Sequence, residues 1–478
     1  MKPPFHTYLN HVLVVWPIIG VMKIAQVPPE RMKIANSAKL IGSRLVTIAL
    51  YLGTIALAYS FSRSSYGRFS AAIIAFAFAT SAGFVTNAHF LTVDMPLLFW
   101  MLAALWAALR LASAPSIRNY AIAGFLTGIA IATKYNGLAV GIALLAAHFF
   151  ATKGAGLRRI ILSRQLAIGL GMVLLGFLFG CPTAPYEPKK FWHDFIYNYT
   201  VTPRYSGQPD RANYLGALGR FPEIVGMPGA ILIAGLAILS CILILKRRDL
   251  GNAATRGFTL SGAVFLLYIL KIGAFPRTET RYVLPAIPFL ILMIGPALQT
   301  CERRKWTLAL LLPVLIYNCL CSYLVGKRFN DDPRLKAQLW MAKNVRSGSV
   351  IESSGTPVPP ARDITDLRLP HMPGRIELFR KVFPEWVQPL VAEREGHADQ
   401  ALFTVAALRK RNPDYIAIYS LDYKVPSETV RGYYGDLLAG KFPYANAFDG
   451  QTPHSPAWIY PRTIDSLRGR ITILQRKD

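Results

Sequence analysis

Residues 95–113 read MPLLFWMLAALWAALRLAS, and this stretch decides the fold class of the chain. Arg110 is its one charged residue, and a helix needs about 20 such apolar residues to cross a bilayer. Comparable runs recur over the first two-thirds of the chain, at residues 40–61, 69–86, 95–113, 119–133, 137–152, 160–181, 226–245, 258–275, 281–299 and 306–325. The pattern predicts a polytopic α-helical membrane protein with about ten transmembrane or re-entrant helices. Residues 119–133 and 137–152 form either two thin spans or one re-entrant hairpin.

The composition agrees with a membrane protein. Of 478 residues, 53% are hydrophobic and 17% are charged, and the mean hydropathy is +0.33. A soluble protein has about 45–50% apolar and about 25% charged residues, and disordered chains are far less apolar. The net charge of +27 would suggest nucleic-acid binding in a soluble protein, but here it fits basic cytoplasmic loops. The five cysteines form no disulfide or zinc-binding pattern.

The basic residues predict the orientation of the helices. Alternate loops are rich in Lys and Arg: Arg63 and Arg68; Arg110 and Arg118; Lys153, Arg158, Arg159 and Arg164; Lys246, Arg247, Arg248 and Arg256; Arg303, Arg304 and Lys305. The positive-inside rule places these loops in the cytoplasm. The 182–225 loop, the turn from Arg277 to Arg281 and everything after about residue 326 then face the periplasm, and the protein is a multi-pass inner-membrane protein.

Three regions follow from this pattern: an outer-face interfacial segment over 1–38, a transmembrane domain over 39–325, and an extracytoplasmic α/β domain over 326–478. The apolar stretch from Val12 to Met22 is short and contains Pro17, so it is expected to lie on the bilayer surface. Basic residues on this outer segment suggest that the chain starts late. Asp332 and Pro333 predict the start of a helix with the apolar stripe Leu335, Leu339, Met341 and Val345. Strands are expected at 349–352, 415–421 and 471–474.

Ionisable residues at the outer helix ends are the candidates for function, because charges at membrane depth are costly. Asp94 lies at one such end with His89 close before it, and it is either a helix cap or an active-site acid. Lys134 breaks an apolar run, and it either binds an anion or extends to the membrane surface. The turn with Arg277, Arg281 and Tyr282 favours a phosphate site over a solvated loop.

The 182–225 loop is rich in aromatic residues and contains Asp194. Aromatic rings between acidic residues suit sugar stacking, and an interfacial aromatic belt explains them equally well. The soluble-enzyme motifs, which include phosphate-binding glycine loops, metal-binding histidine pairs and nucleophile elbows, are absent from the sequence.

Four short motifs follow one another at these helix ends. They are Lys2-Pro3-Pro4-Phe5-His6, Val93-Asp94-Met95-Pro96-Leu97, the segment from Gly128 through Thr133-Lys134-Tyr135, and Arg281-Tyr282-Val283-Leu284-Pro285. Together they resemble motifs of the GT-C glycosyltransferases that use polyprenyl-phosphate sugars, including bacterial protein O-mannosyltransferase-like enzymes and the lipid A aminoarabinose transferase. The resemblance covers most of residues 1–325 and implies a GT-C-like fold.

The resemblance also implies roles for individual residues. Lys2 and Tyr282 would bind the carrier phosphate, supported by Lys134, Arg277 and Arg281. Asp94 would be the catalytic base of an inverting transfer, and the substrate would be bound by His6, His89, Tyr135 and Asp194. No metal and no cofactor is expected. The family's main catalytic acid lies upstream of the first motif, so its absence here makes activity depend on whether Met1 is the true start.

The predicted function is a membrane glycosyltransferase that moves a hexosyl or pentosyl group from a polyprenyl-phosphate donor. The acceptor would be a lipid, glycan or protein at the outer face of the inner membrane. Two alternatives stay open at this point. One is a lipid-carrier transporter or flippase, for which repeated halves and charges at the bilayer midplane would be expected. The other is a non-catalytic membrane anchor for the C-terminal domain.

Overall fold

The computed structural model describes residues 5–26, 32–201, 211–247, 249, 251–302, 305–353, 365–369, 400–420, 428–451, 458–460 and 469–477. The chain divides into two compact units. The first comprises residues 1–199 and 211–322, and the second comprises 200–210 and 323–478. Their boundary falls within one long helix, α20 (Lys305–Asn330).

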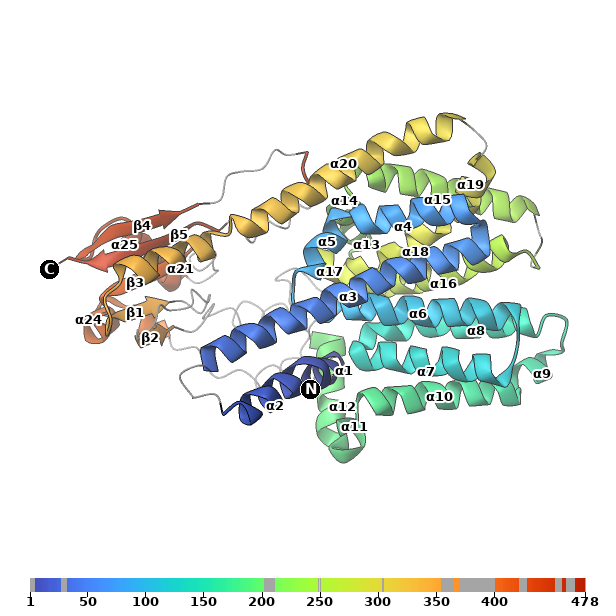
Figure 1. The fold of residues 1–478 in the computed structure, drawn as a ribbon, viewed down its shortest axis with the longest axis horizontal. Helices are drawn as coiled ribbons and strands as arrows, with labels where there is room; N and C mark the ends of the chain where they lie inside the picture. Colours follow the sequence, from blue (N-terminus) through green and yellow to red (C-terminus); the bar gives the residue numbers. More distant parts are fainter. Residues whose placement is uncertain are drawn as a thin grey trace. The chain divides into compact units, whose positions relative to one another are not determined.

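The first unit is helical, and its long helices lie side by side (Figure 1). Its elements before residue 202 are α1 (Phe5–Asn10), η1 (His11–Val15), α2 (Trp16–Ile24), α3 (Met32–Tyr66), α4 (Arg68–Thr80), α5 (Ala82–Ala88), α6 (Asp94–Ser113), α7 (Ile117–Thr133), η3 (Tyr135–Val140), α8 (Gly141–Ala151), α9 (Leu157–Ile161), α10 (Arg164–Gly180), α11 (Thr183–Tyr186), α12 (Pro188–Ile196) and η4 (Tyr197–Val201). They are followed by α13 (Tyr214–Leu218), α14 (Pro222–Val225), α15 (Met227–Arg247), α16 (Ala253–Gly273), α17 (Thr280–Val283), η6 (Leu284–Ala286), α18 (Ile287–Met293), α19 (Gly295–Cys301) and α20.

All ten predicted apolar segments are helical, which confirms the fold class. Among the described residues, seven helical segments are long and apolar enough to cross a membrane, and the bent pair of α4 and α5 would make an eighth. The helix of α7 and the run from Tyr135 to Ala151 are shorter than a full span. They form an antiparallel hairpin, because the Tyr120 hydroxyl near the start of α7 lies 2.5 Å from Nδ1 of His148 near the end of α8.

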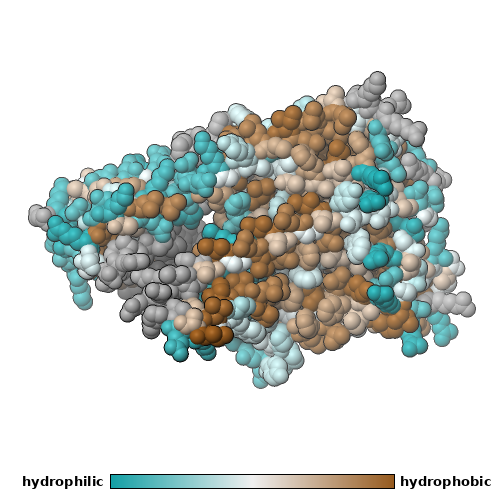
Figure 2. Space-filling view, in the orientation of Figure 1, coloured by the Kyte–Doolittle hydropathy of each residue, from teal (hydrophilic) through white to brown (hydrophobic). Residues whose placement is uncertain are grey.

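The surface of the first unit explains how it meets the bilayer. Apolar residues gather over the helices on the face that Figure 2 shows, and hydrophilic residues border them at the helix ends. Leu40 and Leu52 on α3, Leu174 on α10 and Leu312 on α20 are large exposed apolar side chains. The interior is formed mainly by α6 and the run from α17 to α19, where most residues are buried.

The N-terminal segment differs in length from the sequence expectation. The helical run from Phe5 to Ile24 contains 20 residues and passes the test of length and hydropathy for a membrane span. The helical run begins closer to the N-terminus than the expected stretch from Val12 to Met22, and it includes His6 and Asn10. The side chains of His6 and Asn10 form a hydrogen bond with each other. The Phe5 ring packs against Trp100 of α6. The interfacial location of residues 1–38 stays a prediction.

Helices α7 and α10 pack closely because glycines line their contact. A Cβ atom at Gly124 would overlap the carbonyl oxygen of Gly169, and one at Gly128 would overlap that of Val173. Small residues let two helices approach in a membrane, where the hydrophobic effect does not drive their association. This contact fixes the position of α7, and therefore of Lys134, which directly follows its last residue.

The second unit contains α21 (Pro333–Asn344), β1 (Val350–Ser353), β2 (Thr365–Arg368), η8 (Gln400–Phe403), α24 (Val405–Arg411), β3 (Tyr415–Tyr419), α25 (Glu428–Leu438), β4 (Tyr444–Gly450) and β5 (Ile471–Arg476). The strand order is β2-β1-β3-β5-β4. β1 is parallel to β2 and β3, and β5 is antiparallel to β3 and β4. The three expected strands are β1, β3 and β5.

Residues of β3 alternate between two hydrophobic layers. Ile416 and Ile418 pack with α24 and α25, and Tyr415 and Ala417 pack with α21. The sheet therefore lies between helices on both faces, which is typical of an α/β domain. Asp332 caps α21 as expected, since its carboxylate accepts a hydrogen bond from the backbone N–H of Arg334.

The predicted stripe of α21 is wrong in part. Leu335 and Leu339 are exposed, whereas Ala337 and Met341 face the sheet. Residues 337 and 341 are one helical turn apart, as a buried stripe requires. The size of the leucine side chains misled the assignment, because the close contact with the sheet admits the small side chain of Ala337.

An ion pair is buried beside the sheet. Glu352 on β1 is 1% exposed and accepts a hydrogen bond of 2.7 Å from Nε of Arg411. The Tyr433 hydroxyl donates to the other carboxylate oxygen of Glu352 at 2.5 Å. Burial, together with the nearby negative charge of Glu352, raises the pKa of Tyr433. The three side chains satisfy one another's polar groups and join β1, α24 and α25.

We expect Gly128→Ala to destabilise the protein, because the added Cβ atom forces α7 and α10 apart. Overpacking of this kind costs about 1–3 kcal/mol, so thermal unfolding of the detergent-solubilised protein should begin at a lower temperature. Gly171→Ala is the matched control on α10, since a Cβ atom there meets nothing within 4 Å. Equal melting temperatures for the two variants would contradict the packing role of Gly128.

Candidate active site

An ion pair joins the start of α6 to the end of α7. Asp94 is the first residue of α6 and is 3% exposed. Lys134 follows α7 in an extended conformation, and its Nζ atom donates a hydrogen bond of 2.6 Å to Oδ1 of Asp94. The N-cap position of α6 is occupied by Val93, and the Asp94 carboxylate forms an ion pair with Lys134.

The ring of Tyr282 collects three cationic side chains. Nζ of Lys134 lies 5.3 Å from the ring centroid, and the guanidinium carbons of Arg277 and Arg281 each lie 5.0 Å from it. Cations at such distances are attracted to the electron-rich ring face. The structure therefore brings together five predicted residues from three distant segments: Asp94, Lys134, Arg277, Arg281 and Tyr282.

Glu279 organises the two arginines within their turn. Its Oε1 atom accepts hydrogen bonds of 2.8 and 2.6 Å from Nε and Nη2 of Arg277, and Oε2 accepts one of 2.9 Å from Nε of Arg281. The turn is also fixed from outside, because Nε of Arg220 donates to the Thr278 carbonyl at 2.8 Å. The arginine pair is thus held in place before any ligand binds.

Sequence reasoning missed Lys271, which lies in the last turn of α16. Its Nζ atom donates a hydrogen bond of 3.0 Å to Oδ1 of Asn136, and the Asn136 amide donates one of 3.2 Å to the Tyr268 hydroxyl. The same Nζ atom lies 5.2 Å from the ring centroid of Tyr199. A lysine within an apolar helix was the available signal, since such charges mark functional sites.

Aromatic residues form a wall beside these charges. Tyr135 packs edge-on against Phe195, with 4.9 Å between the ring centroids, and Phe195 stacks on Tyr199 at 6.0 Å. Trp192 stacks on Phe195 at 5.6 Å and is itself exposed. The aromatic loop thus packs against η3, and through Tyr199 it reaches the cation of Lys271.

Other predicted residues have different surroundings. His6 is buried and its Nε2 atom lies 3.0 Å from the Asn10 amide. Nδ1 of His89 lies 2.8 Å from the carbonyl oxygen of Val85, within the same short helix end. Asp194 is buried on α12, with its carboxylate 3.9 Å from Nδ1 of His193. Lys2 lies outside the described residues.

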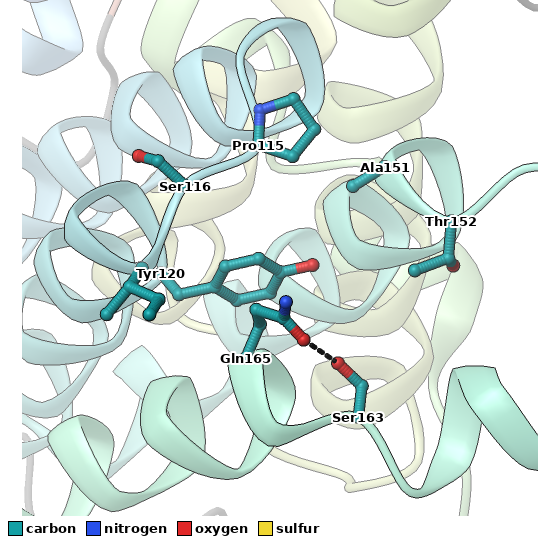
Figure 3. A pocket seen from close by; sticks show the side chains of 8 residues that line it. Pro115, Ser116, Tyr120, Ala151, Thr152, Ser163 and Gln165 are labelled. Atoms are coloured by element: carbon teal, nitrogen blue, oxygen red, sulfur yellow. Dashed lines mark hydrogen bonds between the residues drawn. The ribbon is translucent and has the colours of Figure 1, made fainter.

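The described part of the chain contains no group of three or more His, Cys, Asp or Glu side chains that could hold a metal ion. It does contain a cavity of about 300 Å³ at the other end of α7. The cavity is lined by Pro115, Ser116, Ile117, Tyr120, Ala151, Thr152, Ser163 and Gln165 (Figure 3). None of the predicted site residues lines it, so the cavity is separate from the cluster of Asp94, Lys134, Arg277, Arg281 and Tyr282.

We expect Lys134→Met to destabilise the protein, because it leaves the buried carboxylate of Asp94 without its cation. Breaking a buried ion pair costs about 3–5 kcal/mol. The double variant Asp94→Asn with Lys134→Met should recover most of this loss. Thermal unfolding in detergent measures both effects, and Lys246→Met is the control because Lys246 is an exposed lysine at a helix end. A single variant as stable as the wild type would contradict the pairing.

Comparisons with known proteins address the family resemblance. Residues 31–180, which include Asp94 and Lys134, match the model of the family dolichyl-phosphate-mannose-protein mannosyltransferase. A search of curated proteins by sequence gave no match. Among solved structures, the chain is similar to ArnT from Cupriavidus metallidurans bound to undecaprenyl phosphate, with a TM-score of 0.56 and 14% identity. The match covers 99% of this chain and 87% of that chain.

Two further structures match at lower similarity. ArnT from the same organism in the apo state gives a TM-score of 0.47 at 15% identity, over 99% of this chain and 87% of that chain. The oligosaccharyltransferase AglB from Archaeoglobus fulgidus, in complex with an inhibitory peptide and a dolichol-phosphate, gives 0.45 at 14% identity, over 96% and 67% of the two chains. At the identity found for undecaprenyl-phosphate-bound ArnT, the similarity establishes a common fold. The chain therefore shares its fold with ArnT, as the resemblance to the GT-C enzymes implied.

Proposed function

We propose that the protein is a membrane glycosyltransferase that uses a polyprenyl-phosphate sugar as donor. It transfers the sugar to a lipid, glycan or protein acceptor at the outer face of the membrane. The observation that carries the proposal is the ionic cluster of Asp94, Lys134, Arg277, Arg281 and Tyr282 at one end of a GT-C fold.

The charge of the cluster suits a phosphate leaving group. With its neighbours Lys271 and Glu279 included, the ionic cluster has four cationic side chains (Lys134, Lys271, Arg277 and Arg281) and two carboxylates (Asp94 and Glu279), so it has two more positive than negative charges. A sugar-linked phosphodiester has one negative charge, and the departing phosphate monoester gains a second. Fixed cations stabilise this charge as it develops.

Asp94 is the proposed base. In a single displacement, the acceptor hydroxyl oxygen forms a bond to the anomeric carbon, and the bond from that carbon to the phosphate oxygen breaks. The bonding electron pair leaves with the polyprenyl phosphate, and the hydroxyl proton passes to the Asp94 carboxylate. Lys134 occupies Oδ1 of Asp94, so Oδ2 is the oxygen that accepts the proton. The anomeric configuration is inverted in such a step.

The location of the charges favours a transferase over a transporter. Asp94 begins α6, Lys134 follows α7, Arg277 lies between α16 and α17, and Arg281 is the second residue of α17. These residues meet at helix ends, whereas a transporter binds its substrate near the bilayer midplane. The proposal also places this end of the helices on the periplasmic side of the inner membrane. That placement is inferred from the basic loops at the opposite end of the helices.

We expect Asp94→Asn to lower turnover by about 10²- to 10⁴-fold, the usual contribution of a general base. Binding of undecaprenyl phosphate should change by a few-fold at most. The assay uses the purified full chain with a panel of undecaprenyl-phosphate-linked sugars and mixed membrane-lipid, glycan and peptide acceptors.

Asp249→Asn is the matched control, because Asp249 is an exposed acid in the loop between α15 and α16. Wild-type turnover by Asp94→Asn would refute the role of the base. A wild-type chain that neither binds the carrier nor transfers any sugar of the panel would refute the proposed function.

A further inference from the structure

Lys271 differs from the other cations of the site in its partners. Lys134 is paired with Asp94, and Arg277 and Arg281 are both paired with Glu279. Within the described residues, Lys271 is the cation of this cluster that has no carboxylate partner. Its contacts are the neutral Asn136 amide and the Tyr199 ring.

This arrangement leaves a positive charge uncompensated in an apolar setting. Lys271 is partly buried near the end of a hydrophobic helix, and it also interacts electrostatically with the positive charge of Lys134. Holding an ammonium group there costs free energy, since water solvates it incompletely and the charge of Lys134 repels it. A bound anion offsets both effects.

The neighbours of Lys271 keep its ammonium group in one position. The Asn136 amide is oriented by its own hydrogen bond to Tyr268, whose side chain is fully buried. Tyr199 is held by stacking on Phe195 and by an edge contact with Phe275. An ammonium group has three N–H donors, and Asn136 accepts one of them. The group is therefore held in place with donors to spare for an oxygen-rich anion.

Asn136 also links Lys271 to the rest of the site. It lies two residues after Lys134 in η3, so the backbone that positions the Asp94–Lys134 pair also positions the partner of Lys271. The same short segment therefore contacts Asp94 through Lys134 and Lys271 through Asn136.

We propose that Lys271, positioned by Asn136, is the residue that receives the phosphate of the lipid carrier in the resting site. This inference rests on the proposed function and deepens it. A phosphate group suits Lys271, because it supplies several strong acceptor oxygens and a negative charge. Among the described residues, Lys271 has no carboxylate partner that already supplies them. Arg277, Arg281 and Lys134 keep their carboxylate partners when the carrier first binds.

The experiment measures binding of undecaprenyl phosphate to the purified full chain in detergent micelles. Lys271→Met should weaken binding by about 10- to 100-fold, the loss expected for one charged hydrogen bond. Lys271→Arg, which keeps the charge, should retain most of the affinity. Lys246→Met, an exposed lysine at the other end of the helices, should bind like the wild type. Intrinsic tryptophan fluorescence and thermal unfolding confirm that each variant is folded.

Two further ligands identify the source of the anion. Undecaprenol lacks the phosphate, so Lys271→Met should bind it as the wild type does. Inorganic phosphate should compete with undecaprenyl phosphate for the wild type and lose this effect for Lys271→Met. If Lys271→Met weakened the binding of undecaprenol as much as the binding of undecaprenyl phosphate, the proposed contact between Lys271 and the phosphate would be refuted.

The outcomes separate this inference from the function on which it rests. If Lys271→Met binds undecaprenyl phosphate as tightly as the wild type does, Lys271 is not the phosphate contact, and the proposed transferase stands. If the wild type itself fails to bind undecaprenyl phosphate, both proposals fall. The inference is supported if Lys271→Met binds undecaprenyl phosphate more weakly, while Lys271→Arg keeps most of the wild-type affinity and Lys246→Met keeps all of it.

Discussion

The rest of the site depends on the ion pair between Asp94 and Lys134. The carboxylate of Asp94 is buried at the start of an apolar helix, and Lys134 supplies the compensating cation at 2.6 Å. To reach Asp94, the chain leaves α7 at Lys134 in an extended conformation and continues as the tight η3 turn. That turn places Asn136 against Lys271 of α16. One ion pair thus connects α6, α7 and α16 at the end where the candidate site lies.

The glycine contact between α7 and α10 helps to hold Lys134 near Asp94, although its residues do not belong to the site. In lipid, helices associate through close packing and polar contacts, and Gly124 and Gly128 let the backbone of α10 approach α7 directly. Near the Asp94 end, Ala132 of α7 packs with Cys181, just after α10. The rigid pair keeps Lys134 within hydrogen-bond distance of Asp94, so stability of the helical unit and geometry of the site have the same structural origin.

Sequence reasoning predicted the helices well, because apolar runs of membrane length are visible without knowing their neighbours. It also selected Asp94, Lys134, Arg277, Arg281 and Tyr282, which the structure brings together. It could not predict which residues pair, since Asp94 and Lys134 are 40 positions apart and their contact depends on helix packing.

Other features needed the structure for different physical reasons. Lys271 was overlooked because a single lysine barely changes the hydropathy of α16, and its role depends on Asn136, which is 135 positions away. On α21, the large leucines suggested the wrong buried face, because the fit against the sheet was decided by the small Ala337. The roles of His6, His89 and Asp194 stay predictions.

In the proposed transfer, the resting ion pairs couple two changes of charge. When Asp94 accepts the acceptor proton, its carboxylate becomes neutral and no longer holds Lys134 by charge. At the same time, the departing phosphate gains a second negative charge, while Lys134 lies over the ring of Tyr282 beside Arg277 and Arg281. The ammonium group can then turn from the neutral acid toward the new anion with little movement. The aromatic wall of Tyr135, Phe195 and Tyr199 borders this site.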